Sequence, residues 1–142
     1  MTLLFRHRLS VRFRDCDPLG HVNHAVYLTY LEQARFILWR SQLGFVARRS
    51  GLQHNPSVGF ILARAEIDYR GQARYGDELE VRLSLDAIGR SSFTYAYDVI
   101  EAVGERRIAE ARTVLVLFDY EHERSVPIDD ELRAKLSRAV DV

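Results

Sequence analysis

The sequence predicts an α+β fold, in which a curved antiparallel sheet of five strands wraps around one long central helix. Three observations lead to this prediction. Residues 25–43 are apolar at almost every position around a helix, which is typical of a helix that other elements cover. Five other segments alternate between apolar and polar residues with the period of two of a half-buried strand. Short turns with glycine join the later segments and favour antiparallel pairing of consecutive strands.

The first elements of the chain are a strand, a polar turn and the long helix. We expect the strand at residues 8–14, because Leu9, Val11 and Phe13 alternate there with arginine and serine. Asn23 lies just before the helix and belongs to the residue types that favour the N-cap position. The helix therefore begins directly after a turn that is rich in polar side chains.

The rest of the chain is dominated by strands. Residues 45–56 read as an irregular connection, since they contain glycine, asparagine and proline. Four strands are expected after it, at residues 61–69, 79–87, 93–99 and 107–118. A short polar helix at residues 129–140, with Asp129 as its cap, closes the predicted fold.

The composition describes one folded domain, which we expect to span residues 1–142. The 142 residues are 47% hydrophobic and 28% charged, with a formal net charge of zero. The sequence lacks the excess of basic residues that would indicate a nucleic-acid partner. No apolar run in it is long enough for a membrane span or a secretory signal. Because a single cysteine, Cys16, cannot form an internal disulfide, we expect a reducing compartment, the cytoplasm.

The turn before the helix and the start of the helix carry the most specific pattern. Residues 15–24 read DCDPLGHVNH. In chain order follow AVYL, YLEQAR, RAEIDY, YGDEL and GRSSF, which begin at residues 25, 30, 64, 75 and 89. Together these motifs resemble the hotdog-fold acyl-CoA thioesterases of the 4-hydroxybenzoyl-CoA thioesterase family, over roughly residues 7–120.

This resemblance implies hydrolysis of the thioester bond of an acyl-coenzyme A, with Asp17 as the catalytic carboxylate. It also implies that the backbone amide of His24, at the start of the helix, polarises the thioester carbonyl. Unpaired amides at a helix start carry about half a positive charge, and one such donor contributes roughly 2.7–4 kcal/mol to a transition state. The carboxylate acts as nucleophile or as general base. An ordinary aspartate, with a pKa near ~3.9, is a weak base at neutral pH, which favours direct attack.

Other interpretations of the turn stay open. An aspartate before proline is common as a turn residue that accepts hydrogen bonds from nearby amides, and this is the alternative role of Asp17. For Asp15 we favour a structural role, either an ion pair with Arg12 or Arg14 or a cap of the turn. Cys16 is expected to be a small buried thiol. The spacing of acidic residues, cysteine and histidine fits no zinc pattern, so we expect no metal.

Several residues near the turn or on the predicted strands are candidates for contact with the substrate. These substrate-binding candidates are His21, Asn23, Tyr27, Arg64, Arg90 and Ser91. Arg90 is the first choice for the phosphates of coenzyme A, followed by Arg64 and Arg70. Each candidate also has a structural interpretation: the arginines as surface residues, Tyr27 as core, and Asn23 as the cap of the helix.

The resemblance also implies an assembly. Family members pair as homodimers with their sheets side by side, often associate further into homotetramers, and share each site between subunits. We expect no cofactor, because coenzyme A is part of the substrate, and no nucleic-acid or membrane partner. Two alternative functions remain: a non-catalytic protein that binds acyl-CoA or an acyl-carrier protein, and a hydratase or dehydratase on the same fold.

Overall fold

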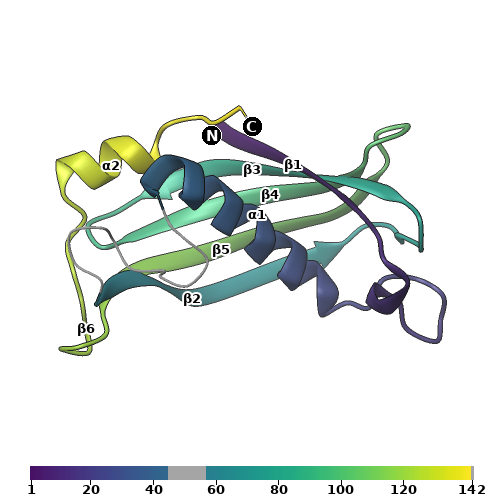
Figure 1. Ribbon diagram of the computed structural model, residues 1–142, viewed down its shortest axis with the longest axis horizontal. Helices are drawn as coiled ribbons and strands as arrows, with labels where there is room; N and C mark the ends of the chain where they lie inside the picture. The colour runs from purple at the N-terminus through teal and green to yellow at the C-terminus, as the bar shows by residue number, and fades with distance from the viewer. Residues whose placement is uncertain (45–56, 142) are drawn as a thin grey trace.

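The computed structural model describes residues 1–44 and 57–141. Within these residues, one antiparallel sheet has the strand order β1-β3-β4-β5-β2, and a sixth strand, β6, pairs with β5. Figure 1 shows helix α1 lying across one face of this sheet. The strands are β1 (Thr2–Ser10), β2 (Val58–Tyr69), β3 (Glu78–Ile88), β4 (Ser92–Glu101), β5 (Arg107–Asp119) and β6 (Arg124–Ser125). The helices are α1 (Val26–Leu43) and α2 (Asp130–Leu136), and Phe13–Asp15 form a short 3-10 turn.

The predicted class, an antiparallel sheet packed against one long helix, is confirmed, but the predicted count of elements is corrected. The described residues form six strands rather than five, because β6 is a two-residue strand that pairs with the end of β5. Two residues are too few to show any periodicity. Helix α2 begins where the sequence predicts, since the side chain of Asp129 accepts a hydrogen bond from the Leu132 amide at 2.8 Å. It ends at Leu136, before the predicted residue 140.

The first strand differs from the prediction of residues 8–14. β1 covers Thr2–Ser10, and Phe13 lies in the 3-10 turn with 79% of its surface exposed. The side chain of Asp15 accepts hydrogen bonds from the backbone amide of Arg12 at 3.0 Å and from its guanidinium at 2.9 Å. This local pairing folds the chain into a turn and ends the alternation early.

The predicted pairing of all consecutive strands is only partly correct. β3, β4 and β5 form the expected meander, whereas β2 pairs with β5 and β1 pairs with β3. The segment between β2 and β3 crosses the end of the sheet instead of forming a hairpin. Its Gly71 lies so close to β5 that an added Cβ would be 2.9 Å from the carbonyl oxygen of Arg107. Glycine is therefore required at this crossing.

Across residues 1–44 and 57–141, helix α1 is buried along one face, so the prediction of a helix covered on all sides is wrong for this part of the chain. Leu31, Ala34 and Leu38 are fully buried against the sheet. On the other side of the helix, Leu28 and Phe36 are 41% and 42% exposed. No helix in the described part of the chain is long and apolar enough to cross a membrane.

The edge strand β2 is also poorly covered. From Ile61 to Glu66 every residue is exposed, in contrast to the buried alternate positions of β4 and β5. The cause is its place in the sheet: β5 pairs with one side of β2, and no other described strand pairs with the opposite side. Together with the outer face of α1, this edge leaves apolar surface exposed.

Candidate active site

The predicted turn is a small hairpin that leads into α1. Cys16 and Val22 form an antiparallel bridge, and the amide of Asp17 donates to the carbonyl of His21 at 3.1 Å. At the tip, Gly20 has a positive φ of 88°, a backbone conformation that favours glycine. The two arms of the turn are therefore hydrogen-bonded to each other.

The hairpin separates a buried face from an open one. Opposite residues in an antiparallel pair point to the same side, and neighbouring residues to opposite sides. Val22 is buried in the core and Cys16, which is half-buried, packs against it. Asp17 and His21 consequently share the other face, where both are half-buried. The structure thus brings together two of the predicted site residues.

Asp17 has one oxygen engaged in the turn. Its Oδ1 accepts a hydrogen bond from the amide of Leu19 at 2.9 Å, as a turn aspartate does. Within residues 1–44 and 57–141, no group donates a hydrogen bond to its Oδ2. The turn role is therefore observed, and it leaves one carboxylate oxygen available for chemistry.

Asp15 has the structural role that the sequence favoured. It is 3% exposed and pairs with Arg12, while the hydroxyl of Tyr30 donates to its Oδ2 at 2.8 Å. Burial opposes ionisation of this carboxyl, but the hydrogen bonds from Arg12 and Tyr30 outweigh it and hold the pKa of Asp15 below its usual range. Burial, and then the bond to Asp15, raise the pKa of Tyr30, so its hydroxyl stays protonated.

The start of α1 offers a free backbone donor. The N-cap residue is Ala25 rather than the predicted Asn23. The side chain of Asn23 instead accepts from the Ala25 amide at 2.9 Å, and its carbonyl accepts from the Val26 amide at 3.0 Å. These bonds turn the backbone before the helix begins. The His24 amide has no acceptor among the described residues, whereas the His24 side chain is exposed.

Tyr27 lies in the core and not on an open surface. It is buried, and its ring packs edge-on against Tyr30 and Tyr69 at centroid distances of 5.9 and 5.5 Å. Burial raises the pKa of Tyr27. The single chain therefore supports the interpretation of Tyr27 as a core residue over that of a substrate contact.

The predicted arginines lie away from the turn. Arg64 is exposed on β2 and pairs with Glu66 at 3.0 Å. Arg90 and Ser91 lie in the turn between β3 and β4, at the end of the sheet opposite to Asp17. At ~3.3 Å per residue, the length of β3 alone separates the two ends by about 33 Å. One chain therefore does not bring Arg90 or Ser91 to the hairpin.

Sequence reasoning missed one residue that touches the candidate site. The hydroxyl of Tyr69, at the end of β2, donates to the carbonyl of His24 at 2.9 Å. Tyr69 belongs to the motif RAEIDY, but its alternation on β2 predicts a face of the sheet and no hydrogen-bond partner. The contact joins the edge strand to the residue that carries the free amide.

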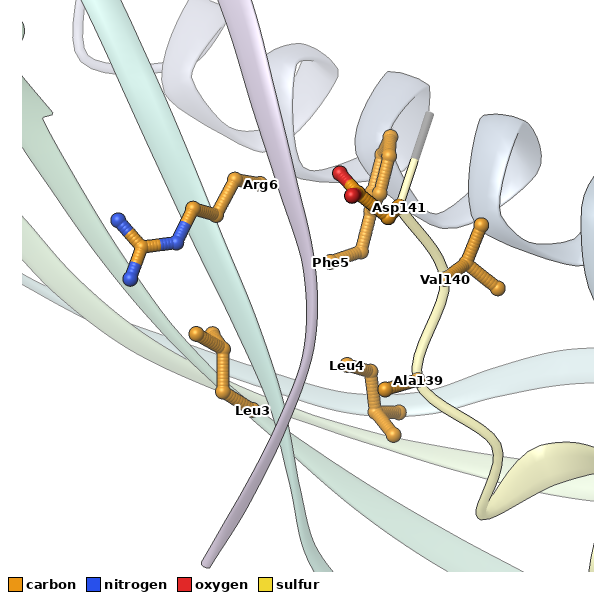
Figure 2. A pocket seen from close by; sticks show the side chains of 7 residues that line it. All are labelled: Leu3, Leu4, Phe5, Arg6, Ala139, Val140 and Asp141. Carbon is orange, nitrogen blue, oxygen red and sulfur yellow. The ribbon is translucent and has the colours of Figure 1, made fainter.

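One pocket in the described part of the chain lies between β1 and the C-terminal segment, away from the hairpin. It has a volume of about 260 Å³, and Figure 2 labels the residues of β1 and of the C-terminal segment that line it. The Val140 amide donates to the Leu4 carbonyl at 2.7 Å between the two segments. None of the predicted site residues lines this pocket. The described residues also contain no group of three histidine, cysteine or acidic side chains that could hold a metal ion.

Comparisons with known proteins agree with this architecture. The long-chain acyl-CoA thioesterase FadM of Escherichia coli (strain K12) is 28% identical over 134 residues, which cover 94% of this chain and 97% of FadM. The 1,4-dihydroxy-2-naphthoyl-CoA hydrolase of Synechococcus elongatus is 28% identical over 137 residues, 96% of this chain and 98% of that protein.

This chain also resembles a solved structure in its fold. The crystal structure of Slr0204, a 1,4-dihydroxy-2-naphthoyl-CoA thioesterase from Synechocystis, superposes with a TM-score of 0.79 at 21% identity, covering 93% of this chain and 94% of that one. Residues 11–136 match the family model described as the Thioesterase-like superfamily. The resemblance to hotdog thioesterases is thereby confirmed, and the chain belongs to the Thioesterase-like superfamily.

Proposed function

We propose that this chain is an acyl-CoA thioesterase that uses Asp17 and the start of α1. One observation carries the proposal: a carboxylate oxygen of Asp17 on the hydrogen-bonded hairpin, and the amide of His24, which directly follows that hairpin before α1, both have no partner in the described chain. The names of FadM and of the naphthoyl-CoA hydrolase, both similar over nearly the whole chain, support thioester hydrolysis.

The amide of His24 would stabilise the negative charge that develops on the thioester oxygen. It is fixed in direction because the carbonyl of the same peptide unit, that of Asn23, accepts from the Val26 amide. An amide aimed at a developing oxyanion contributes roughly 2.7–4 kcal/mol, and the positive end of the helix dipole adds to it. The backbone would therefore act as the electrophilic side of the site.

Asp17 would supply the other side of the reaction. As a nucleophile, its oxygen bonds to the carbonyl carbon, the carbon–sulfur bond breaks, and coenzyme A leaves as a thiolate. Water then cleaves the mixed anhydride and restores the carboxylate. As a general base, Asp17 would instead take a proton from the attacking water. Because an ordinary aspartate is a weak base at neutral pH, we favour direct attack.

The exposed edge of β2 supports a homodimer as the minimal unit. An open edge strand is a template for pairing with another chain, and β2 adds exposed Ile61 and Leu62 to its unpaired backbone. Two copies related by a twofold axis would pair β2 with β2 in antiparallel fashion and form one continuous sheet. Association of two such dimers into a homotetramer remains part of the proposal.

The dimer would complete the site. Antiparallel pairing reverses the second sheet, so the partner's Arg90 and Ser91 come to the end of the sheet where Asp17 lies. Three strand spacings of ~4.8 Å place that turn roughly 15 Å from Tyr69. The thioester would then sit at Asp17 and the phosphates of coenzyme A near the partner's Arg90. His21 and Asn23, half-buried on the hairpin, remain candidates for contact with the thioester region.

A thiol-release assay with a panel of acyl-CoAs tests this function. The panel spans aromatic, short-chain and long-chain acyl groups, and we expect steady release of coenzyme A from at least one class. Tight binding of an acyl-CoA without release would identify a binding protein instead. Consumption of an enoyl-CoA without thiol release would identify a hydratase.

A further inference from the structure

We infer that Asp15 is a positioning residue for thioester hydrolysis, because it ties the hairpin that carries Asp17 to the helix whose start carries the His24 amide. This inference rests on the proposed function. Asp15 is buried and both of its carboxylate oxygens are engaged by Arg12 and Tyr30, so it would act through its neighbours and not on the thioester itself.

The side chain of Asp15 is held from two directions. Arg12 donates to it from its backbone amide at 3.0 Å and from its guanidinium at 2.9 and 3.2 Å. Tyr30 donates from its hydroxyl at 2.8 Å. The first partner lies just after the end of β1 and the second on α1. The carboxylate therefore joins the strand to the helix at a point directly before the hairpin.

The backbone of Asp15 extends the same link to the other arm of the hairpin. Its carbonyl accepts from the amide of Asn23 at 2.9 Å. Asn23 in turn accepts from Ala25 and Val26, and its peptide unit carries the His24 amide. One residue is thus bonded to both arms of the hairpin and, through its side chain, to the helix.

Tyr30 is a rigid anchor for this link. It is buried, and its ring packs edge-on against Tyr27 at 5.9 Å. Tyr30 lies four residues after Val26, the first residue of α1, which is about 6 Å along the helix axis, and His24 lies two residues before Val26. Over so short a distance, a displacement of the Asp15 side chain relative to Tyr30 would move the hairpin by nearly the same amount. A misplacement of about 1 Å can cost a factor of about 100 in rate.

The two catalytic groups would respond differently if the link were lost. The Tyr69 hydroxyl still holds the carbonyl of His24 from the side of β2. Asp17 has no such second support, since its hydrogen bonds to described residues all lie within the hairpin. Loss of the Tyr30 hydroxyl should therefore displace the carboxylate more than the backbone donor. The expected signature is a lower kcat with little change in KM.

The test compares Tyr30→Phe and Asp15→Asn with a matched control, Tyr95→Phe. Tyr95 is equally buried on β4, and its hydroxyl accepts from the indole nitrogen of Trp39 at 2.8 Å, near the other end of α1. The control therefore also loses one buried tyrosine hydrogen bond, but far from the hairpin. We expect Tyr30→Phe and Asp15→Asn to lower kcat by about tenfold or more with KM within about twofold, and Tyr95→Phe to leave both nearly unchanged.

Hydrogen exchange supplies a readout that does not depend on turnover. The amides of Asp17 and Asn23 are bonded across the hairpin, so their exchange should accelerate in Tyr30→Phe and Asp15→Asn and not in Tyr95→Phe. Wild-type kcat in Tyr30→Phe, or a loss of kcat equal to that of Tyr95→Phe, would overturn the positioning role alone. A wild-type protein that releases thiol from no acyl-CoA would overturn the proposed function and the positioning role with it, even with faster exchange in the variants.

Discussion

Asp15 and Asp17 are only two residues apart, and their surroundings differ sharply. Asp15 is buried beneath Tyr30 and paired with Arg12, whereas Asp17 is half-buried with one oxygen bonded to the Leu19 amide. Both oxygens of the Asp15 carboxylate accept hydrogen bonds from Arg12 and Tyr30, whereas Oδ2 of Asp17 has no donor among the described residues. At the residue scale, this difference is the reason that we propose Asp17, and not Asp15, as the catalytic carboxylate.

The depressed pKa of Asp15 predicts an acid-sensitive contribution to stability. Because the pKa is lowered in the folded chain, the stabilisation is complete above the ordinary value of ~3.9 and is lost as the pH falls below it. Urea unfolding of wild type and Asp15→Asn should therefore show a free-energy difference at pH 7 that shrinks towards pH 3. Asp141→Asn, which removes an exposed carboxylate, serves as the control. Parallel pH profiles for wild type and Asp15→Asn would contradict the assigned ion pair.

Residue patterns predicted some of these contacts and not others. The pairing of Asp15 with Arg12 was predictable, because the two residues lie three apart in a polar turn. The hydroxyl contacts of Tyr30 and Tyr69 were not. Apolar periodicity states which face a side chain occupies, and a hydroxyl that reaches a partner 15 or 45 residues away leaves no local signal.

At the scale of elements, local alternation predicted β3, β4 and β5 closely, and it failed at the edges of the sheet. Phe93, Tyr95 and Tyr97 are buried as the period of two requires. The pairing of β2 with β5 was missed, because the partner of a strand is a long-range choice that its own sequence does not contain. The prediction that α1 is covered on all sides failed for a related reason. The sequence shows that the outer face of the helix is apolar, but it does not show which molecule covers that face.

The open edge of β2 predicts the effect of one charged substitution. Leu62→Lys places a lysine in each half of a twofold interface, so the dimer should weaken by about tenfold or more in its dissociation constant. Leu3→Lys is the matched control, because Leu3 is similarly exposed on the other edge strand, β1. Sedimentation analysis over a range of concentrations measures both. A Leu62→Lys variant that dimerises as tightly as Leu3→Lys would rule out β2 as the interface.

At the scale of the whole molecule, the two ends of the sheet explain why one chain looks incomplete as an enzyme. The hairpin with Asp17 lies at one end, and the turn with Arg90 and Ser91 lies at the other, about 33 Å away along β3. A twofold partner would unite them. The family resemblance predicts such a shared site, and we propose that the surfaces that select the acyl group form only when two chains assemble.

The turnover number of Asp17→Asn, measured on the best acyl-CoA of the panel, tests the central claim most directly. The substitution keeps the shape of the side chain and its bond to the Leu19 amide, so the fold should survive, as circular dichroism can verify. We expect kcat to fall by at least about 10³-fold, as when a catalytic carboxylate is removed. A folded variant whose kcat stays within about tenfold of wild type would show that Asp17 is a turn residue and that the chemistry lies elsewhere.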